Sequence, residues 1–129
     1  MRPLKTIALY LDDTLVDTMT VLLDWIEETR GYRVDHSRLA DYQLGDDLKQ
    51  TMDIFNAFHA ADADHKIAAA VGAVEGCRSF LNAGFQLVVV TARKPEMAEK
   101  TDALVTRLFP GVFKDIHSVG HQPDRTPAR

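Results

Sequence analysis

The sequence has a single cysteine, no excess of basic residues and no long hydrophobic run. The lone Cys77 excludes a disulfide within the chain. The chain has 15 Lys and Arg against 19 Asp and Glu, and this net charge of -4 does not favour nucleic acid as a partner. No run approaches the roughly 18 apolar residues of a membrane span, and residues 1–15 do not resemble a signal peptide. These absences predict a cytoplasmic protein without membrane contact.

Length and composition indicate one folded domain. The 129 residues are 46% hydrophobic and 26% charged, which is typical of a globular protein. A chain of this length buries roughly two thirds of its unfolded surface in a single core. We therefore predict a single domain over residues 1–129, with a loose polar tail at 121–129 that contains two prolines.

An apolar run that ends in two carboxylates is the most informative stretch. Residues 6–11 read Thr-Ile-Ala-Leu-Tyr-Leu, which predicts a strand buried on both faces of a parallel sheet. Asp12, Asp13 and Thr14 follow at the carboxyl end of this strand, where open α/β sheets bind their ligands. The alternative is that these residues only form a turn into the next helix.

The remaining elements predict an α/β fold. Further strands are expected at about 85–90 and 115–119, with weak strand character at 32–34. The fold class is a Rossmann-like parallel sheet of about three strands with flanking helices and a helical insert. Helices are expected at 18–30, 46–59, 64–71, 76–83 and 95–108. The inner faces of two of them are expected to contain Leu48, Met52, Phe55 and Phe58, and Met97, Thr101, Leu104 and Leu108.

Two segments resemble motifs of the haloacid dehalogenase-like (HAD) phosphatase superfamily. Its first motif is an apolar strand followed by Asp-x-Asp-x-Thr-Leu, and residues 10–15 read Tyr-Leu-Asp-Asp-Thr-Leu. The match holds at Asp12, Thr14 and Leu15, but Tyr10 stands where the family has its nucleophilic aspartate. Thr91, which follows the strand at 85–90, resembles the Ser or Thr of the second motif that binds the substrate phosphate.

The resemblance implies a partial HAD fold, closest to the deoxyribonucleotidase-like branch. Residues 17–75 would be a small cap-like insert, and 41–44 resemble the linker found in that branch. The third-motif lysine and fourth-motif acids have no counterpart, so the resemblance covers about residues 5–120 of a C-terminally truncated domain. It implies a vestigial general acid–base at Asp12, and phosphate-binding roles at Asp13, Thr14, Thr91 and Arg93.

Tyr10 favours an inactive protein. A phenol is almost entirely neutral at pH 7 and is a poor Mg²⁺ ligand, so Tyr10 supplies neither a nucleophile nor a metal ligand. We therefore expect a catalytically inactive HAD-like domain that acts as a protein-binding regulator, inhibitor or assembly module, without a cofactor. The alternative is a Mg²⁺-dependent phosphatase or 5'-nucleotidase-like hydrolase with a degenerate or partner-completed active site.

The first strand also predicts a protein partner. In the resembled family, strands from the C-terminal part lie beside the first-motif strand, and without them this strand becomes an edge. An apolar edge with unpaired backbone groups is prone to pair with another chain. We expect a homodimer or a protein partner to cover Ile7, Leu9, Tyr10 and Leu11.

Other residues carry weaker signals. His117 and His121 are four apart, but the residues between them indicate strand and turn, so no zinc pair is expected. Cys77 has no histidine nearby in the sequence to activate its thiol, and we expect it to be a buried, apolar side chain.

Overall fold

The computed structural model describes residues 5–34 and 44–119. The chain divides into two compact units, one made of Met1–Asp17 and Ala68–Arg129 and the other of Thr18–Ile67. Three of the predictions concern residues outside the described ranges. These are the loose tail at 121–129, the weak signal at His121, and the linker at 41–44 except for Leu44.

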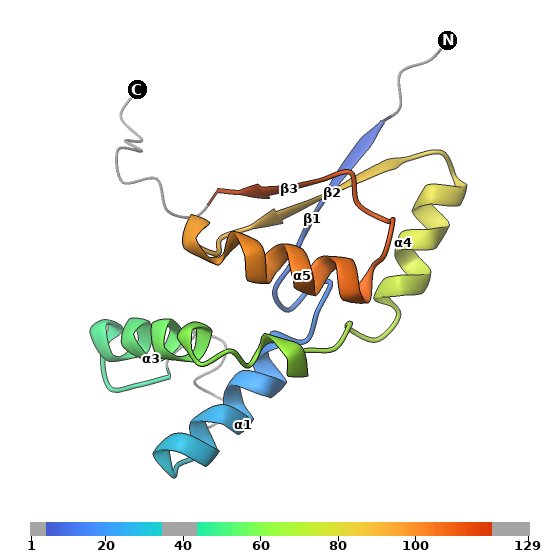
Figure 1. Cartoon of the computed structure of the whole chain (residues 1–129). Helices are drawn as coiled ribbons and strands as arrows, with labels where there is room; N and C mark the ends of the chain where they lie inside the picture. Colours follow the sequence, from blue (N-terminus) through green and yellow to red (C-terminus); the bar gives the residue numbers. More distant parts are fainter. Residues whose placement is uncertain (1–4, 35–43, 120–129) are drawn as a thin grey trace. The chain divides into compact units, whose positions relative to one another are not determined.

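The first unit is built on a parallel sheet of three strands (Figure 1). The strands are β1 (Thr6–Tyr10), β2 (Gln86–Thr91) and β3 (Asp115–Ser118), in the order β1-β2-β3. Both neighbouring pairs run parallel, with Tyr10 opposite Val90 and Thr91 opposite Ser118. The predicted fold class, a three-stranded α/β sheet with flanking helices, is confirmed.

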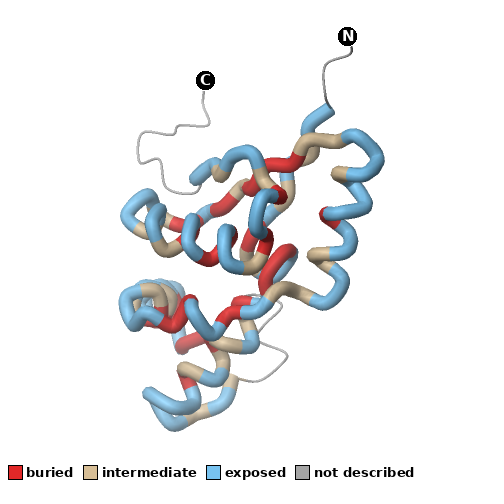
Figure 2. Tube along the Cα trace, turned by 45° about the vertical axis from the view of Figure 1, so that its right-hand side comes forward, coloured by how far each residue is buried: buried red, intermediate tan, exposed pale blue. Residues whose placement is uncertain are grey.

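Burial is greatest in the central strand. Leu87 and Val89 of β2 are almost completely buried, because β2 lies between two other strands and the face of the sheet that carries these two side chains is covered (Figure 2). The prediction that the first strand is buried on both faces is wrong. Thr6, Ala8 and Tyr10 point to one face of β1 and are exposed, since β1 is an edge of the described sheet and only its other face contributes to the core.

Two helices accompany this sheet. α4 (Ala73–Asn82) confirms the helix expected near 76–83 but begins before Gly76, and Gly84 ends the segment with a φ of +94°. Cys77 of α4 is buried, as predicted.

The helix predicted from Pro95 is also confirmed. Pro95 begins the short 3₁₀ turn η2 (Pro95–Met97), which leads into α5 (Ala98–Leu108). The predicted inner stripe is correct at Thr101 and Leu104 but wrong at the ends of the helix, where Met97 and Leu108 are only half-buried. Val105, which follows Leu104 in the sequence, is buried instead, because it lies on the side of α5 that faces the sheet.

The second unit is helical. It contains α1 (Thr18–Arg30), α3 (Leu48–Ala60) and the 3₁₀ turn η1 (Asp64–Lys66). α1 has the predicted bounds, and Gly31 follows it with a φ of +80°. The rings of Trp25 and Phe58 pack edge to face at 5.7 Å between centroids. The buried core residues of this unit are Leu22, Ile26, Leu44, Ile54, Phe58 and Ala63.

The predicted inner face of α3 is wrong in part. Leu48 and Met52 are exposed, whereas Thr51 and Ile54 are buried. Thr51 faces inward because its hydroxyl accepts hydrogen bonds from the backbone N–H groups of Leu44 and Gly45, at 3.3 and 3.2 Å. A polar contact, which a hydrophobic pattern does not register, therefore sets the rotation of this helix.

Two other predicted elements do not form. Residues 32–34 are not a strand, and only the η1 turn exists in the helix expected at 64–71. The following residues are extended because their backbone pairs with the segment after β1. Asp17 donates its N–H to the Ala68 carbonyl, and Ala70 donates to the Leu15 carbonyl, both at 2.9 Å. Tertiary backbone pairing thus overrides the helix propensity of the alanines.

The longest described helices have 13 residues. In the part of the chain that the structure describes, no helix combines the length and the apolar character needed to cross a membrane.

Candidate functional site at the ends of strands β1 and β2

The parallel pairing brings the ends of β1 and β2 together. Tyr10 lies opposite Val90, and the N–H of Leu11 donates to the Val90 carbonyl at 3.2 Å. Asp12 comes directly after this contact, and Arg93 comes two residues after the end of β2. The site thus forms where parallel sheets usually bind ligands.

A compact turn holds Asp12 in place. The carbonyl of Leu11 accepts hydrogen bonds from the N–H groups of Leu15 and Val16 at 3.0 and 3.1 Å, and both of these side chains are buried. Asp13 has a left-handed φ of 61°, which aspartate tolerates better than most residues, and its N–H donates to the Val16 carbonyl at 2.8 Å. The turn after β1 is therefore fixed by its own backbone.

Arg93 binds both oxygens of the Asp12 carboxylate. Its Nε donates to Oδ2 at 3.1 Å and its Nη2 donates to Oδ1 at 2.9 Å. The side chain of Arg93 is 2% exposed and that of Asp12 is 30% exposed. Two parallel hydrogen bonds between a guanidinium and a carboxylate are among the stronger polar contacts in proteins. Asp12 is therefore held as a carboxylate partner of a buried cation.

The Thr91 hydroxyl also has a partner inside the chain. Thr91 is 2% exposed, and its Oγ1 accepts a hydrogen bond from the backbone N–H of Arg93 at 3.0 Å. This contact orders the turn after β2 and positions Arg93. The two predicted phosphate ligands at the end of β2 thus bond to each other, and Arg93 also bonds Asp12. Asp13 and Thr14 lie on the exposed side of the turn after β1.

The predicted nucleophile position, Tyr10, and the predicted interface residues Ile7 and Leu9 lie on β1, and Leu11 directly follows this strand. Tyr10 is 66% exposed, and Ile7 and Leu9 are half-buried. Leu11 has no exposed surface, so its side chain belongs to the core of its own unit and has none left for a partner. Of the four residues expected at an interface, three retain accessible surface.

The side chains at the ends of β1 and β2 do not fit the Mg²⁺ ion that the HAD resemblance implies. Mg²⁺ needs hard anionic oxygens, and the two oxygens of Asp12 already accept hydrogen bonds from a cationic guanidinium. A phenol at Tyr10 does not replace the missing carboxylate. Among residues 5–34 and 44–119, no group of three or more His, Cys, Asp and Glu side chains is arranged to hold a metal ion.

The pairing of Arg93 with Asp12 was not among the contacts expected from the sequence. A signal for it exists, since opposite charges follow two strands that the α/β pattern makes parallel and adjacent. The distance between the two side chains depends on the exact turns after both strands, which only the structure supplies.

The sequence itself matches no family model and no curated protein. Solved structures do resemble the chain. A haloacid dehalogenase-like hydrolase from Streptococcus pneumoniae has a TM-score of 0.61 at 16% identity, over 93% of this chain and 62% of its own. A HAD family hydrolase from Deinococcus radiodurans, solved with bound phosphate and sodium, has a TM-score of 0.59 at 18% identity, over 90% and 58% of the respective chains.

A third solved structure is CbbY from Rhodobacter sphaeroides, a point mutant in complex with xylulose-1,5-bisphosphate. It has a TM-score of 0.55 at 21% identity and covers 97% of this chain and 68% of its own. The chain spans less than two thirds of the length of the Streptococcus and Deinococcus proteins. At these identities the likeness concerns the fold, and the chain has the α/β fold of the HAD-family hydrolases over about three fifths of their length.

Proposed function

We propose that this chain is a catalytically inactive HAD-like domain that binds a protein partner as a regulator, inhibitor or assembly module. The observation that carries the proposal is the ion pair in which Arg93 binds both oxygens of Asp12. A general acid–base must gain and lose a proton during the reaction. A carboxylate that is bonded on both oxygens by a buried guanidinium is stabilised in its charged form and is poorly placed to take up a proton.

Tyr10 adds a second obstacle to catalysis. Removing the nucleophile of a covalent mechanism lowers turnover by roughly a million-fold, as it does in the serine protease subtilisin. A typical turnover of about 10 per second would then fall to about one per day. Such a rate would not support a metabolic role. An inactive domain with the same fold would still be able to bind a protein partner.

We further propose that β1 is the surface that the partner covers. β1 is an edge of the described sheet, and Tyr10 there is 66% exposed beside the half-buried Ile7 and Leu9. An exposed aromatic ring with a polar tip is a favoured interface residue. A second copy of the chain is the simplest partner, since one edge can then cover the other.

The deoxyribonucleotidase-like branch and the cap are part of the same proposal. The helical unit Thr18–Ile67 interrupts the sheet-bearing unit between β1 and β2, which is where that branch has its small cap. We assign this unit the role of a cap-like insert, within a single domain that extends over the whole chain.

The second candidate function is a phosphatase or 5'-nucleotidase-like hydrolase. Its support is the fold, because the similar solved structures are HAD-family hydrolases and one of them holds phosphate. In this case the active site would be degenerate or completed by a partner, and Mg²⁺ would be needed.

A phosphatase assay separates the two functions. The full chain would be incubated with p-nitrophenyl phosphate and a panel of nucleoside monophosphates in the presence of Mg²⁺. We expect no turnover above background for the wild type, Asp12→Ala or the control Asp53→Ala, an aspartate in the exposed Lys49 ion pair. Turnover that is lost in Asp12→Ala but kept in Asp53→Ala would overturn the inactive assignment.

A further inference from the structure

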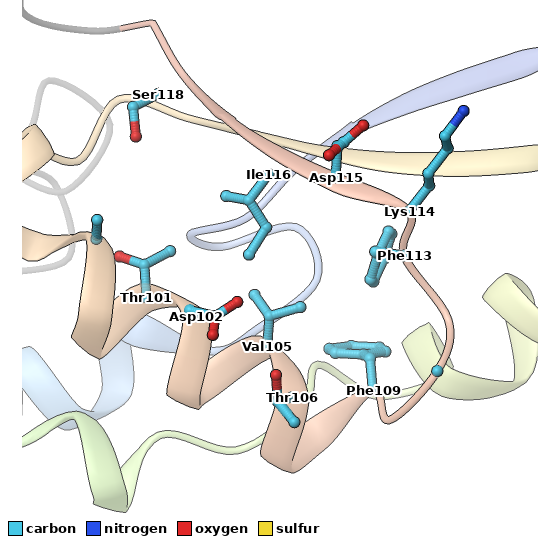
Figure 3. A pocket seen from close by; sticks show the side chains of 12 residues that line it. Thr101, Asp102, Val105, Thr106, Phe109, Phe113, Lys114, Asp115, Ile116 and Ser118 are labelled. Atoms are coloured by element: carbon cyan, nitrogen blue, oxygen red, sulfur yellow. The ribbon is translucent and has the colours of Figure 1, made fainter.

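The two faces of the sheet in the first unit differ in what covers them. The strands follow one another in the order β1-β2-β3, so right-handed connections place α4 and α5 on the same face. Figure 3 shows the side chain of Ile116 in β3 pointing toward α5 and that of Asp115 pointing away from it. The described helices of this unit thus leave the other face of the sheet open. Parallel sheets normally have both faces covered, which makes this open face a candidate binding surface.

The strand pairing defines which side chains form the open face. Alternate residues of a strand share a face, and paired residues of neighbouring strands lie side by side. The Gln86 side chain donates a hydrogen bond to the Thr6 hydroxyl at 3.3 Å, as expected for side chains on one face. Beyond this bond the open face contains two rows that run across the sheet in register. The rows are Ala8, Val88 and Asp115, and then Tyr10, Val90 and His117.

The open face is apolar over β1 and β2 and polar along β3. Ala8 and Tyr10 are exposed on β1, and Tyr10 is 66% exposed. The central strand contributes two valines, of which the more buried, Val88, is 8% exposed. Asp115 and His117 are both exposed on β3. An apolar centre beside a polar rim is the usual composition of a protein interface.

We propose that the open face joins two copies of this chain, packed face to face about a two-fold axis. The axis crosses the strands at the level of Val89, between the two rows. It lays each strand over the same strand of the second copy in the opposite direction, so that each row faces the other. Three pairs of facing side chains result, each formed twice: Ala8 with Tyr10, Val88 with Val90, and Asp115 with His117.

These three pairs are complementary in size and in polarity. The large Tyr10 ring meets the small Ala8, and valine meets valine. The His117 imidazole of one copy donates a hydrogen bond to the Asp115 carboxylate of the other. An axis along the strands would instead press Asp115 against Ala8 and leave the carboxylate without a partner, which is costly. Because every pair is formed by residues of the same face, the surface fits a second copy of itself.

This inference rests on the proposed function, because it names the partner and the surface for the protein-binding role. The contact includes β1 and extends it across β2 and β3. Two sheets that pack face to face with their strands roughly aligned, at about 30°, form a common arrangement in proteins. Pairing of the two β1 edges alone would leave the open face in water, so the two kinds of dimer can be distinguished.

Sedimentation equilibrium of the full chain over a concentration series tests the inference. The wild type should be a dimer at high micromolar concentration. His117→Asp places a second carboxylate opposite Asp115 of the other copy, twice in each dimer, and should raise the dimer Kd at least about tenfold. Combining it with Asp115→Lys restores opposite charges across the axis. The double variant should return the Kd to within about threefold of the wild-type value.

A matched control separates this effect from a general change in charge. Asn82→Asp also adds one carboxylate, at an exposed position of α4 that is not part of the open face. It should leave the dimer Kd unchanged. Asp115 and His117 are exposed, so their substitution does not put folding at risk.

Three outcomes would overturn the inference. They are a monomeric wild type, a Kd for His117→Asp no higher than that for Asn82→Asp, and a double variant that does not recover the wild-type Kd. None of them reverses the inactive assignment, which the phosphatase assay with Asp12→Ala tests separately. A dimer that responds to Leu9→Lys but not to His117→Asp would be held by the β1 edge alone, and the proposed function would stand without the open face.

Discussion

The guanidinium of Arg93 bonds both carboxylate oxygens of Asp12 across 81 positions of the sequence. The pair joins the turns that follow two adjacent strands, and it places a nearly fully buried cation against a partly exposed anion. In this position the pair both stabilises the end of the sheet and occupies the carboxylate on which the HAD resemblance would place acid–base chemistry.

The first prediction concerns the stability that this pair provides. Asp12→Ala and Arg93→Met should each lower the free energy of unfolding by about 2–3 kcal/mol, between the values for exposed and for fully buried ion pairs. The double variant should lose less than the sum of the two, because the second change removes a charge that the first left without this partner. Urea unfolding of the four proteins measures the coupling.

A matched cycle on an exposed pair serves as the control. Lys49 and Asp53 approach to 2.8 Å, but their side chains are 84% and 61% exposed. The hydrogen bond from Lys49 to Asp53 raises the pKa of Lys49, yet solvent screens the pair and we expect no measurable coupling. Equal coupling in the two cycles would contradict the special role of Arg93 and Asp12.

The second prediction is that restoring the nucleophile does not restore activity. Tyr10→Asp would place a carboxylate at the end of β1, but Asp12 would still be bound by Arg93. We expect p-nitrophenyl phosphate hydrolysis to remain at background, as measured by absorbance over several hours. Turnover that appears in this variant and disappears in Tyr10→Asn would show that Asp12 is able to serve as an acid–base in spite of Arg93.

The third prediction is that Mg²⁺ does not bind tightly at the first motif. Too few anionic oxygens are available there, because Arg93 already bonds both oxygens of Asp12 and Tyr10 offers only a phenol. Isothermal calorimetry should detect no site with a micromolar Kd. A micromolar site that is lost in Asp12→Asn would refute this expectation.

The fourth prediction is that the wild-type chain self-associates through β1. Leu9→Lys should shift the protein toward monomer, because it places a charge on the half-buried side of this edge strand. Val71→Lys is the control, since Val71 is a fully exposed apolar residue far along the chain from β1. Light scattering at high micromolar concentration measures the mass. A monomeric wild type would leave only a different protein as the partner.

The fifth prediction concerns the buried thiol. Burial raises the pKa of Cys77 above its ordinary value of 9.0. In the folded protein the thiol therefore stays protonated at a pH where the unfolded chain has already lost this proton. The contribution of the Cys77 thiol to the free energy of unfolding is present below pH 9 and declines as the pH rises above 9. Between about pH 8 and pH 10 the stability of the wild type should fall more steeply than that of Cys77→Ala.

A chemical probe gives the same information without a change in sequence. At neutral pH an aromatic disulfide reagent should modify Cys77 more than about tenfold more slowly than it modifies the urea-unfolded chain, because the folded thiol is both covered and protonated. Equal rates for the folded and the unfolded protein would contradict the burial of Cys77.

The sequence determined those elements whose signals are local. The β-branched run in β2 and the helical spacing in α1 predict these two elements with nearly their observed bounds, because burial and periodicity act over a few neighbouring residues. The strand–helix alternation is likewise enough to predict a parallel sheet, and with it the meeting of Asp12 and Thr91 at one end of the sheet.

The tertiary structure decided what each side chain meets. Arg93 bonds Asp12, 81 positions away, because the ends of β1 and β2 lie side by side in the sheet. The exposure of Tyr10 depends on what covers β1, and the rotation of α3 depends on a polar contact of Thr51. The Arg93–Asp12 pair joins residues far apart in the sequence, and the Thr51 contact depends on the exact course of the backbone before α3. Neither contact leaves a periodic pattern along the chain from which it could be predicted.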